Sequence, residues 1–451
     1  MTQLGVRPRC WLLVAAVFVA TDLRVIAQDT APGEETRSAP ETAMPNDNSP
    51  NEGTPAGPGG TAGFEGRSTL DTPPELRGIY DKPFLTGLWR RSYFGGYYEL
   101  EYHSEKDGIM NTPEGFRLHR TNLFFFTEVT DRVRFASELE FETEFEGAET
   151  SDDIETKIEM AFVDWTIFQE FVIRGGALLV PLGRINVNHD GPIRLFTERP
   201  MVSTFVIPTT FTEPGIGAQG TINPTDALEL SYEAYAVNGF NVLDADGELA
   251  APLVDSQDLL SEARTSLGGD NNGNTTGTGR LGLTLFDAVE VGGSWHVGTY
   301  DERSDNILAL VAADWGMSYS LSGFDFGLQG EAAIADFERD AFARSSGVPK
   351  EYWGYFVEGS VGRMPHFLRR TIPYVFDDEG STFVLALRWD YVDLDGDRGE
   401  IIEPGINFRP ATDTVFKLSY RFSLNSVGNR DLPGREDWDD EGFVFSLSSY
   451  F

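Results

Sequence analysis

Apolar and polar side chains alternate along many short stretches of this chain. The stretch RVRFASELEFETEFE places Val133, Phe135, Leu139, Phe141 and Phe145 on one face and Arg134, Glu138, Glu140, Glu142 and Glu144 on the other. Similar stretches occupy 92–103, 226–237, 381–391 and 414–424. Successive side chains of a strand point to opposite faces, so a period of two predicts β-strands with one apolar and one polar face. A helical repeat of about 3.6 residues is not seen in them.

The connections between these stretches alternate between short and long. Short ones carry turn residues, as in VTDR at 129–132, INPTD at 222–226 and RPATD at 409–413. Long ones, at 241–277, 339–350 and 425–441, are polar and acidic. This layout predicts an all-β fold over 92–451, a closed antiparallel transmembrane β-barrel of about 16 strands. A soluble β-sandwich also alternates, but ring residues near the strand ends and the absence of a covering helical layer favour the barrel.

The N-terminal part of the chain predicts export. Arg7 and Arg9 precede the apolar run WLLVAAVFVA, and VIA at 25–27 supplies small residues before a cleavage site. We therefore expect a signal peptide at 1–27, cleaved after Ala27, followed by an acidic Pro/Gly-rich disordered linker and lead-in at 28–91. The single cysteine, Cys10, falls in the signal peptide. No later run of about 18 apolar residues occurs, which argues against membrane-spanning helices.

The charge balance narrows the function. The 451 residues include 72 Asp and Glu against 35 Lys and Arg, for a formal net charge of −37, and only five of the basic residues are lysines. So acidic a chain lacks the basic surface that nucleic acids need, and no nucleic-acid partner is expected. No cofactor and no metal are expected, because His103, His119, His189, His296 and His366 show no metal-ligand spacing.

Two further motifs resemble binding sites only in part. GIGAQG at 215–220 matches a dinucleotide-binding pattern, but a turn between strands follows it instead of the required helix. DLDGDRGEIIEP at 393–404 starts like a calcium loop, yet its sixth residue is Arg398 and its twelfth is Pro404. We interpret it as an exposed acidic loop, with weak calcium binding as the alternative. An enzymatic barrel is a further alternative without a nucleophile motif to support it.

The connection after the strand FVIRGGALLVPLG differs from the other long ones, because it carries prolines, aromatic residues and charges of both signs. Loops with their own apolar residues tend to pack and to function, so we predict that 183–214 folds into the lumen and narrows it. The alternative is a loop folded over the rim. The candidate constriction and pore-lining residues are Arg184, His189, Asp190, Arg194, Glu198, Arg199, Glu138, Glu140, Glu142, Glu144, Arg388, Asp390, Lys417 and Arg421.

Several motifs resemble the phosphate-selective porin O and P family. They are the strand ending in PLG, then NVNHDGP, RPMV, IPTT and GIG, with YEAYAVNGFN, RWDYVD and EPGINFRP further on. The resemblance covers about 92–451 and implies a sixteen-stranded porin, typically a trimer, whose third extracellular loop folds inward. The family's phosphate selectivity is linked to arginines and lumenal lysines. Here lysine is scarce and glutamates point to the predicted lumen, so phosphate is not carried over as the substrate.

These observations together predict a porin of the outer membrane that lets small hydrophilic solutes or ions diffuse passively through its lumen. The alternative is a plugged structural or adhesive barrel that uses its long acidic loops to bind partners. Expected partners are outer-membrane lipid, the solutes and the barrel-assembly machinery. The C-terminal stretch FVFSLSSYF predicts a last strand that pairs with the first, and Phe443, Phe445, Leu447 and Phe451 are its predicted assembly signal.

Overall fold

The structure is a computed structural model that describes residues 85–89, 91–104, 114–146, 149–250, 259–265, 267–270, 272–376, 380–424 and 441–451. Its strands are β1 (Leu85–Trp89), β2 (Ser92–His103), β3 (Gly115–Thr130), β4 (Val133–Glu146), β5 (Glu149–Phe168), β6 (Phe171–Leu179), β7 (Thr212–Thr225), β8 (Leu228–Val237), β9 (Thr276–Leu285), β10 (Val289–Thr299), β11 (Ile307–Leu321), β12 (Phe324–Phe337), β13 (Glu351–Arg363), β14 (Thr382–Leu394), β15 (Asp397–Ala411), β16 (Thr414–Ser423) and β17 (Gly442–Tyr450). The helices are η2 (Val202–Val206), α2 (Leu259–Glu262), α3 (Ala341–Ser345), α4 (His366–Thr371) and α5 (Pro373–Phe376).

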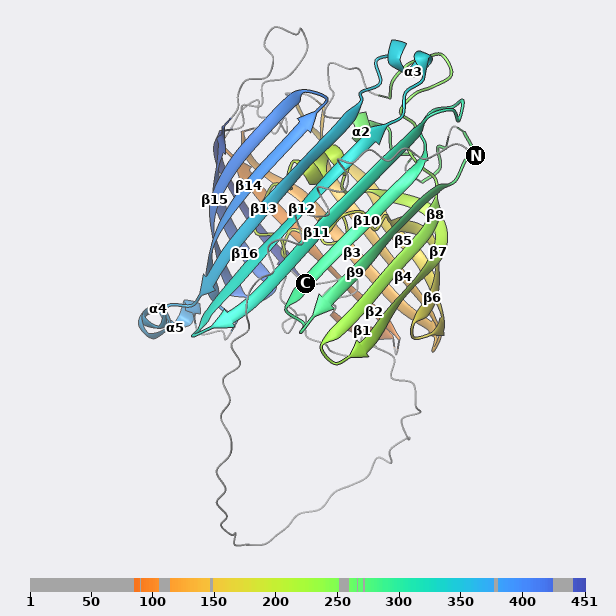
Figure 1. Cartoon of the computed structure of the whole chain (residues 1–451). Helices are drawn as coiled ribbons and strands as arrows, with labels where there is room; N and C mark the ends of the chain where they lie inside the picture. The colour runs from red at the N-terminus through yellow and green to blue at the C-terminus, as the bar shows by residue number, and fades with distance from the viewer. Residues whose placement is uncertain are drawn as a thin grey trace, which may run out of the picture. The chain divides into compact units, whose positions relative to one another are not determined.

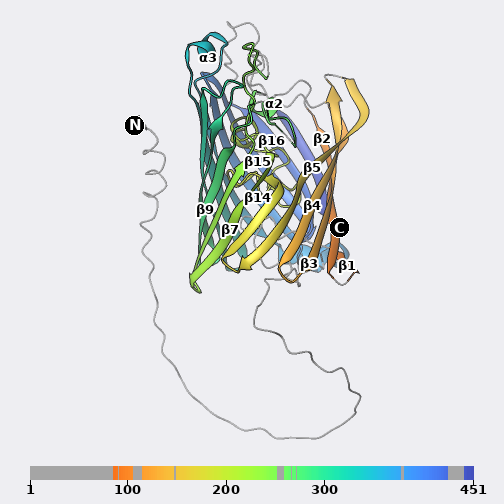
Figure 2. The same cartoon turned by 90° about the vertical axis from the view of Figure 1, so that its right-hand side faces the viewer.

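The strands from β2 to β17 close into a barrel (Figures 1 and 2). Each pairs antiparallel with the next along the chain, and β17 returns to β2, with Val444 opposite His103 and Tyr450 opposite Tyr97. The prediction of a closed antiparallel barrel of 16 strands is therefore confirmed. Closure pairs the strand edges with one another, which a spanning sheet requires because the bilayer core offers no water to its backbone groups.

The two faces of the wall differ as the alternation predicts. On β4 the side chains of Glu138 and Glu140 point inward and are buried, while the neighbouring Leu139 is partly exposed on the other face. Along β3 and β14 the outward residues Leu118 and Leu385 are more than half exposed. An apolar outer face in contact with lipid and a polar inner face are the signature of a transmembrane barrel.

Aromatic rings gather on the outer side near both ends of β13 to β16. Tyr355 stacks on Tyr391 with ring centroids 5.6 Å apart, at the end where β14 meets β15. Phe383 stacks on Phe408 at 4.7 Å, at the opposite end of the same strands. Such paired bands match the aromatic girdles that lie at the two interfaces of an outer-membrane bilayer.

The two ends of the barrel carry different connections. Most connections at one end, called here the short-turn end, are tight turns, such as those at 131–132, 226–227 and 412–413. The exception is the connection between β13 and β14, which holds α4 and α5 and which the sequence did not predict (Figure 1). The long connections at 238–275 and 338–350 lie at the other end, the long-loop end. None of the helices in the described residues is long and apolar enough to cross a membrane.

The acidic stretch that starts at Asp393 is not a loop. Its middle is a two-residue turn between β14 and β15, made by Asp395 and Gly396 with positive φ angles of 55° and 99°. Glycine adopts such angles freely and aspartate tolerates them, which suits the tight turn of a β-hairpin. Asp393 accepts a hydrogen bond from the Gly396 amide and pairs with Arg398 at 2.9 Å, so local contacts account for its carboxylate.

The seam of the barrel is completed by the last residue of the chain. The Phe451 amide donates a hydrogen bond to the Gly96 carbonyl oxygen at 2.9 Å, and the Gly96 amide donates one to the Phe451 carbonyl oxygen at 3.1 Å. A Cβ atom at Gly96 would lie only 2.8 Å from the Phe451 ring and 2.2 Å from the Asn122 carbonyl oxygen, so only glycine fits there. Beyond this point β1 pairs with the start of β2, with Trp89 opposite Ser92. The last aromatic residue therefore lies against the first barrel strand at the short-turn end.

Deletion of Phe451 is expected to lower the yield of inserted barrel while export continues, because both seam hydrogen bonds and the terminal aromatic side chain are lost. The yield is measured as the heat-modifiable, membrane-extracted fraction relative to total exported protein. The matched control is Phe422→Ala on β16, which removes a partly exposed outward ring but leaves the C-terminus intact. Equal yields of the deletion variant and the wild type would contradict the assembly role.

Candidate functional site

A single long connection, residues 180–211 between β6 and β7, fills part of the barrel interior and is called here the inner loop. Almost all of its side chains are buried, and η2 lies within it. Val202, Phe205 and Val206 are at most 5 % exposed and belong to one apolar cluster with inward side chains of β11 to β14. Burying each such side chain contributes about 1.5–3 kcal/mol, which holds the loop against that part of the wall.

Backbone groups of the inner loop are bound by charged side chains of β12 and β14. Glu331 accepts hydrogen bonds from the amides of Arg184 and Ile185 and from the Ser203 hydroxyl, the last two at 3.1 and 2.9 Å. Asp390 accepts the Met201 amide at 2.8 Å. Such charge-assisted contacts satisfy loop groups that would otherwise be buried without partners.

Arg388 on β14 links the same loop to three carboxylates. It donates to the Glu198 carbonyl oxygen at 2.8 Å and to Glu403 at 2.6 Å. Its guanidinium nitrogens also lie 3.5 Å from Glu358 and 3.6 Å from Asp390. The Arg388 side chain is 1 % exposed, so this network is shielded from water and its charges depend on one another.

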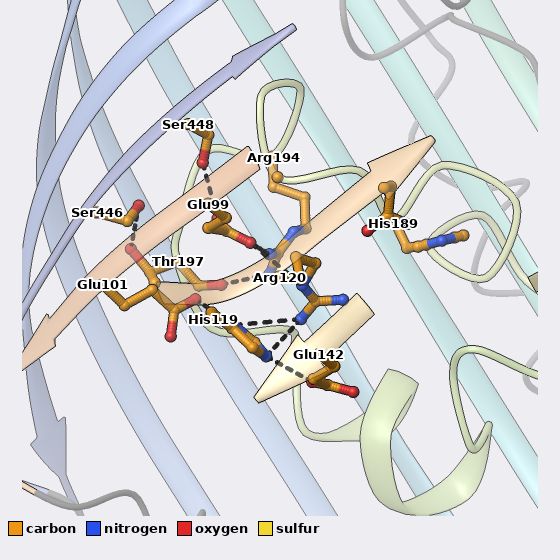
Figure 3. Close-up of polar contacts among 12 residues, drawn as sticks. Glu99, Glu101, His119, Arg120, Glu142, His189, Arg194, Thr197, Ser446 and Ser448 are labelled. Atoms are coloured by element: carbon orange, nitrogen blue, oxygen red, sulfur yellow. Dashed lines mark hydrogen bonds and ion pairs between the residues drawn. The ribbon is translucent and has the colours of Figure 1, made fainter. Parts of the chain in front are cut away.

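The strands β15 to β17 hold the first half of the inner loop. Their inward side chains make five hydrogen bonds of 2.7–2.9 Å with the loop. Four donate: Asn407 to Leu195 O, Arg409 to Pro192 O, Lys417 to Gly191 O and Tyr450 to Asp190, and Ser446 accepts from Thr197. Arg194 reaches the other way, to Glu99 on β2, at 3.0 Å (Figure 3). The inner loop is thus tied to the wall from β12 round to β2.

The wall formed by β3, β4 and β5 presents a different surface, a chain of charges that pair with one another. The His119 ring nitrogens lie 2.6 Å from Glu101 of β2 and 2.7 Å from Glu142 (Figure 3). Arg120 pairs with Glu140 at 3.1 Å. The pairing of β2 with β3 has a register shift between Glu99 and Leu100, so no β2 residue lies opposite His119 in the strand register. A β-bulge of this kind re-aims side chains, which brings two consecutive residues to the inner face.

Between this wall and the inner loop lies a cavity of about 720 Å³. Its charged lining residues come from three sources: Arg120, Glu140, Glu142, Glu155, Lys157 and Glu159 from the wall, Arg199 from the inner loop, and Glu262 and Arg264 from the connection between β8 and β9. A second cavity, on the other side of the inner loop, holds only about 20 Å³, enough for about one water molecule. The larger of these two cavities therefore lies on the β3–β5 side.

The connection after β8 completes the cavity. Leu259 and Leu260 of α2 are buried in the same apolar cluster as η2. Arg264 donates to the carbonyl oxygens of Pro208 and Thr210 at 3.2 and 2.7 Å. The described part of this connection therefore packs onto the inner loop, and its arginine shares the cavity with Arg199.

Both loop arginines of the cavity stay charged. Burial, and after it the positive charges of Arg120 and Arg194, lowers the pKa of Arg199 to about 10. Burial also lowers the pKa of Arg264, while the carboxylates of Glu262 and Glu213 oppose that shift. At neutral pH both guanidinium groups are cations, so the cavity has positive charges on its loop side and an excess of carboxylates on its wall.

The structure divides the predicted pore-lining residues into two groups. Three of them line the large cavity: Glu140, Glu142 and Arg199. The others bind the inner loop to the wall, lie within that loop or lie behind it: Arg184, His189, Asp190, Arg194, Glu198, Glu138, Arg388, Asp390, Lys417 and Arg421, all at most 7 % exposed. The side chain of Glu144 lies outside the described residues. The sequence analysis missed the other six charged residues of the lining: Arg120, Glu155, Lys157, Glu159, Glu262 and Arg264.

The missed residues gave little signal in the sequence. Arg264 lies in a distant connection, and Glu159 reaches the inner face through a bulge that no spacing reveals. One signal for the position of the inner loop was available in the sequence. The run ILALVAA at 307–313 is apolar on both faces, which is typical of a strand covered on both sides. Leu308 and Leu310 of this run pack in the cluster that holds the inner loop.

A closed barrel with an apolar outer band, a polar interior and a loop folded into it defines the class of outer-membrane porins. The model of the family "Phosphate-selective porin O and P" matches residues 91–286, which confirms the resemblance over these residues; the motifs RWDYVD and EPGINFRP lie beyond the match. A protein of Aquifex aeolicus (strain VF5), described as uncharacterized, is 28 % identical over 340 residues, which cover 72 % of this chain and 74 % of that one.

Two solved structures resemble this chain with TM-scores below 0.5. The anion-selective porin from Comamonas acidovorans is 10 % identical, with a TM-score of 0.48 over 80 % of this chain and 99 % of that chain. The outer membrane channel DcaP of Acinetobacter baumannii is 11 % identical, with a TM-score of 0.45 over 80 % of this chain and 97 % of that chain. The barrel fold and the family match over residues 91–286 together support an outer-membrane channel.

Proposed function

We propose that the chain lets small hydrophilic solutes and ions diffuse passively across the outer membrane through the 720 Å³ cavity beside the inner loop. The inner loop is the constriction, because it occupies the side of the barrel that faces β12 to β17, and the 720 Å³ cavity lies between it and β3 to β5. Insertion by the barrel-assembly machinery after cleavage at Ala27, and assembly as a trimer, belong to the same proposal.

The charges of the cavity set its selectivity. Five carboxylates and four cations line it, which leaves a formal charge of −1. Opposite signs face each other across the path, with Arg199 and Arg264 on the loop side and Glu140 and Glu142 on the wall. Such an arrangement favours small polar solutes and a weak preference for cations, and it does not resemble a ladder of basic residues that would select phosphate.

The alternative of a plugged adhesive barrel is less well supported. The described residues of the connection at 238–275 pack inward, as Leu259, Leu260 and Arg264 show. The large cavity also argues for a path through the barrel. No observation on the described residues favours display of this connection to a binding partner.

A cysteine placed in the cavity is expected to make the channel sensitive to thiol reagents. In a Cys10→Ser background, Lys157→Cys on β5 puts a thiol on the cavity wall, and a bulky methanethiosulfonate reagent attached there should remove most of the single-channel conductance in planar bilayers. The matched control is Ser345→Cys on the exposed helix α3, which should be modified without a change in conductance. Full conductance after modification at position 157 would exclude this path, and absence of any stepwise conductance would exclude a channel.

A further inference from the structure

Two buried carboxylates and a histidine from three separate segments meet between the barrel wall and the inner loop. They are Glu138 of β4, Glu159 of β5 and His189 of the inner loop, and one ligand atom from each lies within 4.8 Å of the others. The three residues are at most 3 % exposed. Carboxylate oxygen and imidazole nitrogen are the donor atoms that divalent transition metals bind in proteins.

The histidine is oriented for a ligand. Its Nδ1 lies 2.9 Å from the carbonyl oxygen of Asn186, so Nδ1 carries a proton and donates to that oxygen. The other nitrogen, Nε2, lies 3.2 Å from each of the two Glu159 oxygens. Metal-binding histidines are held in this way, with one ring nitrogen donating to a carbonyl group and the other directed at the ion.

Asn122 of β3 supplies an independent observation. Its side chain is completely buried, and its amide nitrogen lies 2.9 Å from Glu138 and 2.8 Å from Glu159. Its Oδ1 has no hydrogen-bond partner among the described residues, which is costly for a buried oxygen. A half-turn of the amide exchanges nitrogen and oxygen and directs this oxygen at the two carboxylate groups, where it becomes a fourth ligand.

Glu159 reaches the cluster because β5 has a bulge at this residue. In the pairing of β4 with β5, Glu138 lies opposite Met160 and Leu139 opposite Ile158, which leaves Glu159 as the extra residue. Both Glu159 and Met160 are buried on the inner face as a result. No metal site was expected from the sequence, because the histidines show no metal-ligand spacing. Spacing along the chain cannot reveal ligands that come from β4, from a bulge in β5 and from a loop.

A bound cation would lower the repulsion within the cluster. Two buried carboxylates this close repel each other, and a divalent ion between them would reduce that repulsion. Access is available from the lumen, because Glu159 also lines the large cavity and accepts a hydrogen bond from Thr210 at 3.2 Å. Two other clusters of this kind occur among the described residues, Glu99 with Glu101 and His119, and Glu101 with His103 and Glu198. Both are less suited, because they share Glu101, which already pairs with Arg117 at 2.6 Å.

We propose that Glu138, Glu159, His189 and Asn122 bind one divalent transition-metal cation, with zinc(II) as the best fit to a four-ligand oxygen and nitrogen set. The ion joins the inner loop to β3, β4 and β5 at the edge of the cavity. The proposal does not depend on whether the cavity conducts, because it is tested by binding alone.

The test is zinc titration of the refolded, chelator-treated barrel by calorimetry at pH 7, with magnesium for comparison and cobalt(II) absorption as a spectroscopic report on the ligands. We expect one zinc per chain, no competition by magnesium, and a cobalt spectrum of low coordination number. Glu159→Gln and His189→Ala should each weaken zinc binding at least about tenfold, whereas Asn122→Asp, which adds a charged oxygen ligand, should strengthen it.

The matched control is Glu142→Gln, which removes a carboxylate from the same cavity but not from the cluster, and its zinc affinity should equal that of the wild type. Each variant is first checked for heat-modifiable migration, and Glu138→Gln serves as a second ligand variant if His189→Ala does not fold. Absence of zinc binding by the wild type, or equal affinity in Glu159→Gln and Glu138→Gln, would overturn the proposal.

Discussion

Replacement of Arg388 by methionine is expected to lower the free energy of unfolding of the barrel by about 3–5 kcal/mol, the usual cost of removing one partner from a buried ion network. The guanidinium group lies among Glu358, Asp390 and Glu403 and is 1 % exposed. Methionine fills much of the same volume but leaves three carboxylates without their shared cation. The hydrogen bond to the Glu198 carbonyl oxygen is lost as well, which also loosens the inner loop.

The measurement is equilibrium unfolding in denaturant, followed by tryptophan fluorescence, with the barrel folded in lipid vesicles. The matched control is Arg398→Met, because Arg398 makes a similar ion pair with Asp393 but its side chain is 62 % exposed. An exposed pair is worth at most about 1 kcal/mol, so the control should change little. Arg388→Lys should lie between the two, since lysine keeps the charge but not the forked geometry. Equal stability of Arg388→Met and the control would show that the network contributes no net stabilisation.

The fold could be predicted from the sequence because a barrel is periodic. The alternation around Glu138 and Glu140, and the turn residues at 129–132 and 409–413, each follow from one strand and its neighbour. The last strand was also predictable, because 443–451 had the same alternation and a closed sheet needs a partner for its edge. The helices α4 and α5 were not predicted, since a long connection at the short-turn end breaks the rule that the other connections follow.

The site was predictable only in outline. The composition of 183–214 indicated a packed loop, and the structure places it inside the barrel. Which charges meet there depends on two facts that no repeat encodes: the bulges at His119 and Glu159, and the inward packing of Arg264 from a connection far along the chain. Arg184 and Arg194 were predicted to line the constriction together with Arg199, yet they bind Gln329 and Glu99 and do not line the large cavity.

This division among the arginines leads to the largest functional effect that we expect. Reversing the two loop-side charges of the cavity, in Arg199→Glu with Arg264→Glu, should make the channel strongly cation-selective. The formal charge of the lining changes from −1 to −5, because each replacement exchanges one positive for one negative charge. The interaction energy between a unit charge and a monovalent ion about 5 Å away in water is about 0.8 kcal/mol. Each charge reversal therefore changes that energy by about 1.7 kcal/mol. Screening by salt reduces this effect, and a rise of about tenfold in the cation-to-anion permeability ratio is expected near 0.1 M salt.

The permeability ratio follows from the reversal potential of single channels or of many channels under a potassium chloride gradient. The control is Arg344→Glu, an exposed arginine on the outer helix α3, which makes the same charge change away from the cavity and should leave the ratio unchanged. Arg199→Gln separates electrostatics from a shift of the loop, because it should give about half the effect of Arg199→Glu alone if charge is the cause. An unchanged reversal potential in the double variant would mean that ions do not pass between the inner loop and β3–β5. The small cavity on the side of Arg184 and Arg388 holds about 20 Å³, so ions could pass through it only if the inner loop moved.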